Sequence, residues 1–167
     1  MKIPRNLINR KNFLVIVILW TIAVTVIRAI RLPNNYSQSH WLLDYRFGFM
    51  KRGLIGSICS VVTAFFGVEM SRDIITVLSG VMYGFFILAF LFVIFNLLKR
   101  YNYSSNIVVI VLLFCSSPFF VMSGHLFGYF DAILYVAAIT SIWFIEKKRF
   151  IWTALISSLA ILIHESY

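Results

Sequence analysis

A long run without a single charged side chain extends from Ile74 to Leu98, and it limits the possible folds more than any other feature of the sequence. A helix needs about 20 consecutive, mostly apolar residues to cross a lipid bilayer, so this run is long enough to cross. The whole chain is 61% hydrophobic and only 13% charged, whereas soluble domains carry about a quarter charged residues. The sequence therefore predicts an integral membrane protein.

Hydropathy along the rest of the chain predicts an all-α fold, a polytopic transmembrane helix bundle of about five spans. The segment from Leu54 to Val68 is ambiguous, because it is short and rich in Gly, Ser and Thr. We expect it to form an interfacial or re-entrant helix within an outer loop, residues 31–73. Residues 1–167 are expected to form a single membrane domain, with spans near residues 13–30, 74–98, 107–123, 127–145 and 150–165.

The distribution of Lys and Arg predicts the orientation, because these residues prefer the cytoplasmic ends of spans. If Leu54 to Val68 does not cross, nine of the 15 basic residues lie on the cytoplasmic side and six on the outer side. If the segment crosses, everything after it inverts and ten basic residues lie outside. The first arrangement is favoured, so the N-terminus is expected in the cytoplasm. The first helix is expected to stay uncleaved, because Val26 to Arg31 offers bulky and charged residues where a signal-peptide cleavage site needs small ones.

Charge and cysteine content bear on two other classes of function. The net charge of +9 could suggest a nucleic-acid partner, but the basic residues are divided among loop ends rather than gathered on one soluble face. We therefore expect no nucleic acid, and membrane lipid as the contact of these cations. Cys59 and Cys115 lie in apolar segments without a CxxC pattern, which predicts buried free thiols rather than a metal site.

Asp44 is the most informative single residue, because only six carboxylates occur in the chain. The aromatic and basic residues around it are typical of an interfacial belt, in which rings lie at headgroup depth and cations reach lipid phosphate. A belt does not explain an aspartate, which anionic headgroups repel. Ionisable groups at membrane depth are usually functional, so Asp44 is a candidate functional residue.

Two further polar groups are expected on the same outer side. His125 and Asp131 are six residues apart, so on a continuous helix they would point about 240° apart and would share a site only across an irregular turn. Asp131 could instead cap the N-terminus of a helix. His164 and Glu165 end the last predicted span, and adjacent positions on a helix diverge by about 100°, so only one of them can point into the bundle.

The segment Leu43-Asp44-Tyr45-Arg46-Phe47-Gly48-Phe49-Met50-Lys51-Arg52-Gly53-Leu54-Ile55-Gly56 resembles part of multi-span membrane proteins associated with bacterial surface polysaccharides. The order of a cytoplasmic N-terminus, one span and a long outer loop with an early Asp also looks like the start of the GT-C class of membrane glycosyltransferases. Members of that class often have adjacent acidic residues in this loop, whereas Asp44 stands beside Tyr45. They usually have eight or more spans, so the resemblance implies an amino-terminal portion, incomplete at the C-terminus, in a bacterial cytoplasmic membrane.

This resemblance implies a reaction on a polyprenyl-phosphate-linked sugar at the outer face, in cell-surface polysaccharide assembly. Asp44 would be the catalytic base or a metal ligand, and Asp131 the second acidic residue, with about 10 Å or less between the carboxylates if they share a ligand. Phosphate release needs cations, and Asp131 and Glu165 could orient the acceptor or hold a divalent cation through oxygen ligands. The candidate substrate-binding residues are Arg46, Lys51, Arg52, His125 and Glu165.

Two alternatives stay open beside the enzyme. A non-catalytic accessory membrane subunit, or a truncated fragment that needs a partner subunit or a missing C-terminal half, would also explain a short multi-span chain. A transporter or flippase component would place charges inside its spans along a water-filled path. The uncharged run from Ile74 to Leu98 disfavours that last alternative.

Overall fold

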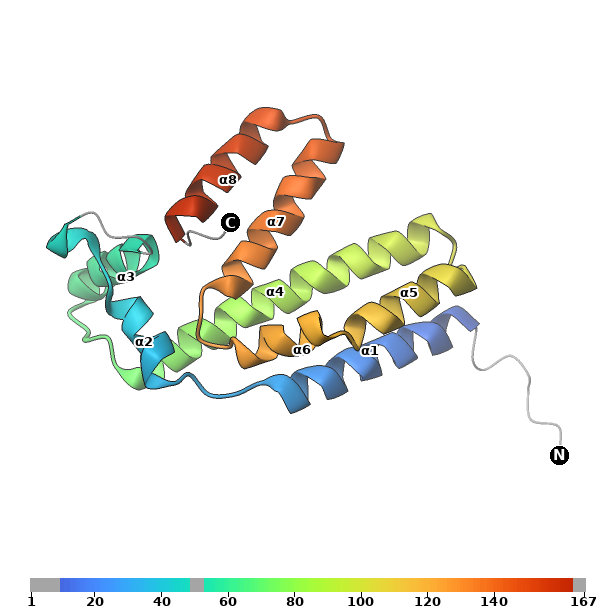
Figure 1. Ribbon diagram of the computed structural model, residues 1–167, viewed down its shortest axis with the longest axis horizontal. Helices are drawn as coiled ribbons and strands as arrows, with labels where there is room; N and C mark the ends of the chain where they lie inside the picture. Colours follow the sequence, from blue (N-terminus) through green and yellow to red (C-terminus); the bar gives the residue numbers. More distant parts are fainter. Residues whose placement is uncertain (1–9, 49–52, 164–167) are drawn as a thin grey trace. The chain divides into compact units, whose positions relative to one another are not determined.

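A computed structural model describes residues 10–48 and 53–163 (Figure 1), and every regular element in those two ranges is helical. The predicted all-α class is therefore confirmed. The elements in chain order are α1 Arg10–Ala29, α2 Asn35–Leu42, η1 Tyr45–Phe47, α3 Gly53–Phe66, α4 Arg72–Arg100, α5 Ser105–Cys115, α6 Pro118–His125, α7 Asp131–Glu146 and α8 Phe150–Ile163, where η1 is a 3₁₀ turn.

Three helical stretches of the described chain are long and apolar enough to cross a membrane, namely residues 11–29, 72–100 and 105–125. They correspond to the first three predicted spans. The third stretch is interrupted after Cys115, where Pro118 begins a new helix. Pro has no N–H to donate to the preceding turn, which accounts for a break at this point.

The fourth predicted span begins later than expected. The span expected at 127–145 begins only at Asp131, because residues 126–130 form turns and Gly128 adopts a φ of 96°. At 1.5 Å per residue, α7 with 16 residues extends about 24 Å, and the 14 described residues of α8 extend about 21 Å. The hydrocarbon core of a bilayer is about 30 Å thick, so α7 reaches across only part of it.

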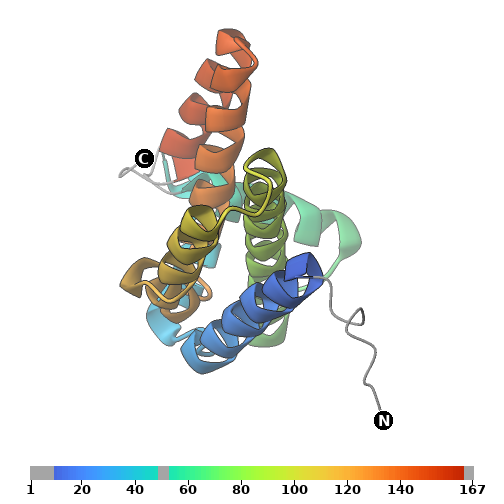
Figure 2. The same cartoon turned by 90° about the vertical axis from the view of Figure 1, so that its right-hand side faces the viewer.

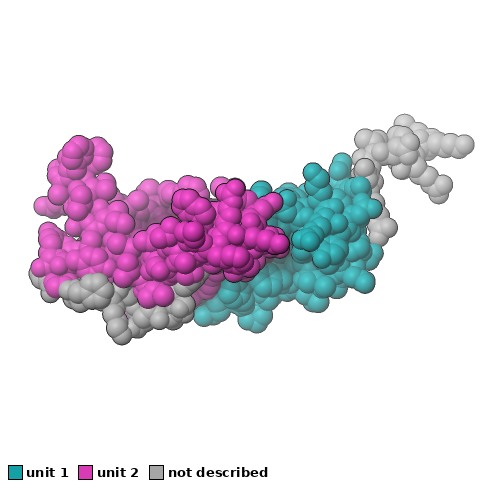
Figure 3. Space-filling view, turned by 90° about the horizontal axis from the view of Figure 1, so that it is seen from above, with its two compact units in different colours: residues 1–30, 91–125 teal, residues 31–90, 126–167 magenta. Residues whose placement is uncertain are grey.

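The chain divides into two compact units, coloured separately in Figure 3. Unit 1 contains residues 1–30 and 91–125, in which α1 lies beside α5 and α6 (Figures 1 and 2). At the N-terminal end of α1, the Lys11 ammonium lies 5.5 Å from the centre of the Tyr103 ring, just before α5. At the other end α6 contacts α1 through Gly124, where a Cβ would come within 2.6 Å of the Ala29 Cβ. The helices α1 and α5–α6 therefore run parallel.

Unit 2 contains residues 31–90 and 126–167, in which α7 and α8 form an antiparallel hairpin that packs on the loop elements. The Trp41 indole N–H donates a 2.9 Å hydrogen bond to the Gly128 carbonyl, and the Trp41 ring packs edge-on against Phe130. Gly128 is tightly enclosed, since a Cβ there would come within 2.8 Å of Pro33. One buried hydrophobic cluster of this unit consists of Trp41, Ile75, Phe130, Leu134, Ala160 and Ile163.

Both cysteines are free thiols, as the sequence predicts. Cys115 is fully buried inside unit 1, whereas Cys59 is only half-buried on α3.

Candidate functional site

Asp44 is buried between α2 and η1, and it caps the 3₁₀ turn that follows it. Its Oδ1 accepts a 3.0 Å hydrogen bond from the Arg46 backbone N–H, and its Oδ2 accepts a 2.6 Å bond from Arg46 Nε. Arg46 Nη2 lies 2.5 Å from the same oxygen, so two guanidinium nitrogens contact one carboxylate oxygen. The Asp44 side chain is 2% exposed and the Arg46 side chain 73% exposed. The carboxylate is thus held from the solvent side by a cation that remains at the surface.

The electrostatics of this pair keep Asp44 ionised. The Arg46 guanidinium lowers the pKa of Asp44, and this effect outweighs the opposite effect of burial. The hydroxyl of Ser60 on α3 lowers the same pKa further. In return the carboxylate raises the pKa of Arg46. Asp44 therefore carries a negative charge at neutral pH.

Two glycines let α3 approach this segment closely. A Cβ at Gly56 would lie 1.8 Å from the Leu43 carbonyl oxygen, and a Cβ at Gly53 would lie 2.7 Å from the Tyr45 ring. The Ser57 hydroxyl accepts a 2.9 Å hydrogen bond from the Tyr45 N–H and donates to the Gly53 carbonyl at 2.7 Å. The small residues that made this segment ambiguous in the sequence are therefore the contact surface of α3 with the Asp44 loop.

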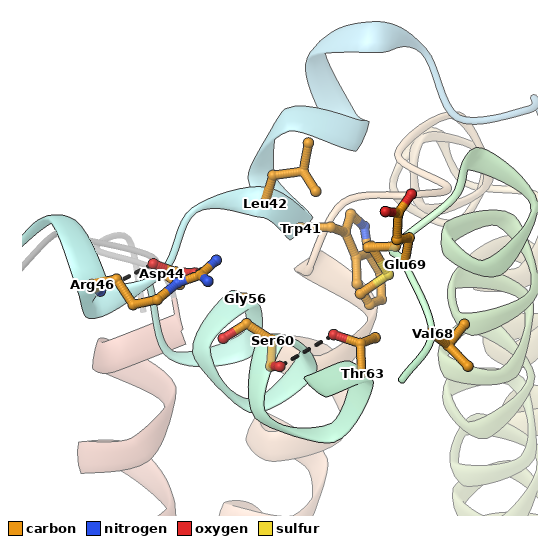
Figure 4. Close-up of a pocket in the computed structure, with 10 residues that line it drawn as sticks. Trp41, Leu42, Asp44, Arg46, Gly56, Ser60, Thr63, Val68 and Glu69 are labelled. Carbon is orange, nitrogen blue, oxygen red and sulfur yellow. Dashed lines mark hydrogen bonds and ion pairs between the residues drawn. The ribbon is translucent and has the colours of Figure 1, made fainter. Parts of the chain in front are cut away.

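Asp44 and Arg46 line a pocket of about 290 Å³ within unit 2 (Figure 4). Hydroxyl groups come from α3 and a second carboxylate from Glu69, on the exposed link between α3 and α4. Sequence reasoning did not single out Glu69, although a carboxylate between two apolar segments was the available signal. The lining residues are Trp41, Leu42, Asp44, Arg46, Gly56, Ser60, Thr63, Val68, Glu69 and Met70.

The other predicted site residues lie in different places. Asp131 occupies the first turn of α7, is half-buried, and is not among the residues lining this pocket. Phe130 is the N-cap of α7 and makes no side-chain capping bond, so the alternative in which Asp131 caps the helix is wrong. The Asp131 charge still lies at the positive end of the helix dipole.

His125 ends α6 in unit 1, and the turns at 126–130 separate it from Asp131, so the two residues do not share a continuous helix. Lys51, Arg52 and Glu165 lie outside the described residues. Within the described part of the chain, no three His, Cys, Asp or Glu side chains form a group that could hold a metal ion. The metal role of Asp131 with Glu165 stays a prediction.

A second polar residue that sequence reasoning missed is His40. It is buried on α2 and lies edge-on to Tyr36 at 4.8 Å and to Tyr129 at 5.6 Å between ring centres. Its ring also lies 6.4 Å from Phe130. This aromatic cluster fixes α2 against the turn that precedes α7, next to the Trp41–Gly128 hydrogen bond.

The fold and the site together define an α-helical integral membrane protein, in which the segment between the first two long helices builds a charged pocket. Residues 12–166 match a protein family described as "Uncharacterised membrane protein Rv1490", and the chain belongs to this family. Comparisons with curated proteins and with solved structures found no match. The family description supports the membrane location and names no biochemical activity.

Proposed function

We propose that this protein is a GT-C-like membrane enzyme that uses a polyprenyl-phosphate-linked sugar at the outer face of the bacterial cytoplasmic membrane, in cell-surface polysaccharide assembly. The observation that supports it best is the pocket in which buried, ionised Asp44 is paired with exposed Arg46. A carboxylate and a cation side by side suit a reaction that removes a proton and releases a phosphate.

The packing inside unit 1 supports the proposed topology. Since α1 and α5–α6 run parallel, their starts would lie on one side of the membrane and their ends on the other. Helix α4 leads back to the start of α5, so it must cross in the opposite direction. The chain between Ala29 and Arg72 would then begin and end on the same side, and α3 would return without crossing. With the N-terminus in the cytoplasm, as charge predicts, the Asp44 pocket faces outward.

The exposed surface of α3 also supports a position at the membrane interface. Its 14 residues extend about 21 Å, too short for a full crossing. One face is small and polar and covers the Asp44 loop. The other face exposes large apolar side chains, which in a membrane protein contact lipid: Ile58, Val61, Val62, Phe65 and Phe66.

In the proposed reaction the acceptor hydroxyl oxygen attacks the anomeric carbon of the sugar. The bond from that carbon to the phosphate oxygen breaks, the phosphate leaves with the electron pair, and the hydroxyl proton passes to Asp44. Arg46 would bind the lipid phosphate together with Lys51 and Arg52. Movement of Arg46 onto the phosphate would remove the main cause of the lowered Asp44 pKa, making the carboxylate a stronger base when substrate is present. Asp131, His125 and Glu165 are proposed to orient the acceptor.

The test is transfer or hydrolysis of a polyprenyl-phosphate-linked sugar by the full-length protein in proteoliposomes. We expect Asp44→Asn to reduce turnover by about 100-fold or more, within the range typical for loss of a general base. Asp73→Asn is the matched control, because Asp73 is an exposed acid in the first turn of α4 and does not line the pocket. Wild-type turnover of Asp44→Asn would refute the catalytic role.

A non-catalytic accessory subunit is the second candidate, and one observation favours it. Asp44 caps η1 and binds Arg46 through both oxygens, which is sufficient to explain its presence structurally. In that case no lipid-linked sugar is turned over by the purified protein, and Asp44→Asn alters folding or partner binding instead.

A further inference from the structure

The tip of the α7–α8 hairpin carries a second candidate binding surface, distinct from the Asp44 pocket. The turn between the helices is Lys147-Lys148-Arg149, and all three cations are exposed. Glu146 precedes them, so the four residues carry a formal charge of about +2 at neutral pH. The tip is separated from Asp131 by the length of α7, about 24 Å.

The backbone of this turn is well ordered by hydrogen bonds. The N–H groups of Lys147, Lys148 and Arg149 donate to the carbonyls of Trp143, Ile145 and Phe144, at 3.1, 2.9 and 2.9 Å respectively. Lys148 adopts a φ of 56°, a left-handed conformation that Gly occupies at lower cost. The turn thus presents a cation at a position where a glycine would be easier to accommodate.

A shallow hollow of about 590 Å³ lies directly beside these cations. Lys148 and Arg149 form its charged rim, and apolar side chains from the first two turns of α8 form its wall. Ile151, for example, is 78% exposed. The first turn of a helix also offers backbone N–H groups and a positive dipole end to an anion. The lining residues are Lys148, Arg149, Phe150, Ile151, Trp152 and Leu155.

We propose that this hollow binds an anionic phospholipid, with its headgroup phosphate on Lys148 and Arg149 and the start of an acyl chain along the wall of α8. A soluble anion would use the cations but not the exposed apolar wall, and a lipid without net negative charge would use the wall but gain less from the cations. Only an amphiphile with a negative headgroup matches both parts. Stacked Phe144 and Trp152, with ring centres 6.2 Å apart, brace the two helices beneath the site.

The short hairpin makes such a lipid useful to the fold. Because α7, about 24 Å long, is shorter than the hydrocarbon core is thick, the tip needs polar contacts from lipid headgroups of the nearby leaflet. A bound anionic headgroup supplies those contacts. This role is independent of the proposed transfer reaction and of the Asp44 pocket.

The experiment is native mass spectrometry of the full-length protein in neutral detergent, titrated separately with phosphatidylglycerol, phosphatidylcholine and inorganic phosphate. At about 1 kcal/mol per cation and 1.4 kcal/mol per tenfold in affinity, Lys148→Gln/Arg149→Gln should bind phosphatidylglycerol roughly 30-fold more weakly. Phosphatidylcholine binding should weaken much less, because the choline cation offsets the charge of its phosphate. Arg28→Gln/Arg31→Gln removes two exposed cations elsewhere and is the matched control.

Two more variants keep the test decisive. The swap Lys148→Arg/Arg149→Lys preserves the charge and should bind phosphatidylglycerol like the wild type, which also checks that the turn tolerates substitution. Ile151→Ser should weaken binding of both lipids. Unchanged phosphatidylglycerol affinity in Lys148→Gln/Arg149→Gln, an equal loss in the Arg28/Arg31 control, or inorganic phosphate binding as tightly as the lipid would each overturn the proposal.

Discussion

At the scale of single residues, the chemistry of the candidate site depends on the Asp44–Arg46 pair. The carboxylate is buried, yet it stays ionised because the guanidinium binds it through side-chain contacts to Oδ2 while the Arg46 backbone N–H binds Oδ1. The same contacts give Asp44 a local structural role at the start of η1. Arg46, being mostly exposed, is the partner able to change contacts when an anion arrives.

The lowered Asp44 pKa makes part of the stability dependent on pH. A carboxyl with a lower pKa in the folded state stabilises the fold above its unfolded value, near 3.8, and this contribution is lost as the pH falls through the folded pKa. We therefore expect wild-type protein to melt at a higher temperature than Asp44→Asn at pH 7, with the difference shrinking below pH 3.8. Thermal unfolding in detergent across pH 3–7 measures it, and a constant difference would contradict the ion-pair explanation.

Trp41 is the second residue with a specific prediction. Its indole N–H binds the Gly128 carbonyl inside the core of unit 2, so Trp41→Phe leaves a buried acceptor unpaired. Such a loss costs about 1–3 kcal/mol. The control is Trp20→Phe, which should leave the free energy of unfolding nearly unchanged, because Trp20 is 71% exposed on α1. Chemical denaturation in detergent compares the stabilities of the two variants. Equal stabilities would mean that the Trp41–Gly128 hydrogen bond does not contribute measurably to the stability of the fold.

At the scale of elements, α3 is positioned by a backbone-to-backbone approach rather than by large side chains. At Gly56 the obstacle to any Cβ is the Leu43 carbonyl, which cannot rotate away like the end of a flexible side chain. The position of α3 in turn brings Ser60 and Thr63 to the pocket. A single methyl group at this point should therefore alter both stability and pocket shape.

We expect Gly56→Ala to destabilise the protein by about 1–3 kcal/mol or more, as overpacked contacts do. The control is Gly84→Ala on α4, where no atom lies within 4 Å of the added Cβ. That change should be neutral or stabilising by up to about 1 kcal/mol, since Ala favours helix more than Gly. Thermal unfolding measures the stability of both variants. Similar losses of stability at the two positions would contradict close packing at Gly56.

At the scale of the whole molecule, the topology follows from which helices cross. Single cysteines at Ser39, Ser71, Asn102 and Lys147, in a chain with Cys59 and Cys115 changed to Ala, should report it. All four positions are exposed. We expect an impermeant thiol reagent to label the Ser39 and Ser71 positions from outside and the other two only after permeabilisation. Opposite accessibility of positions 39 and 71 would mean that α3 crosses the membrane.

Hydropathy and charge alone were sufficient to predict an all-α membrane protein and its three long helices, because transfer of apolar side chains to lipid dominates their energetics. The actual start of α7 depended on Gly128, whose φ and tight contact with Pro33 end the apolar run as a turn. Periodicity carries no information about such a local conformation.

The charged composition around Asp44 was visible in the sequence, and so was Arg46 as its neighbour. Only the tertiary structure brought Glu69, Ser60 and Thr63 to the same pocket and showed that Asp44 is held by Arg46. The physical reason is that composition and hydropathy determine which segments enter lipid, whereas a pocket depends on close contacts between segments distant in sequence. At Gly56 that contact is set by the absence of one methyl group.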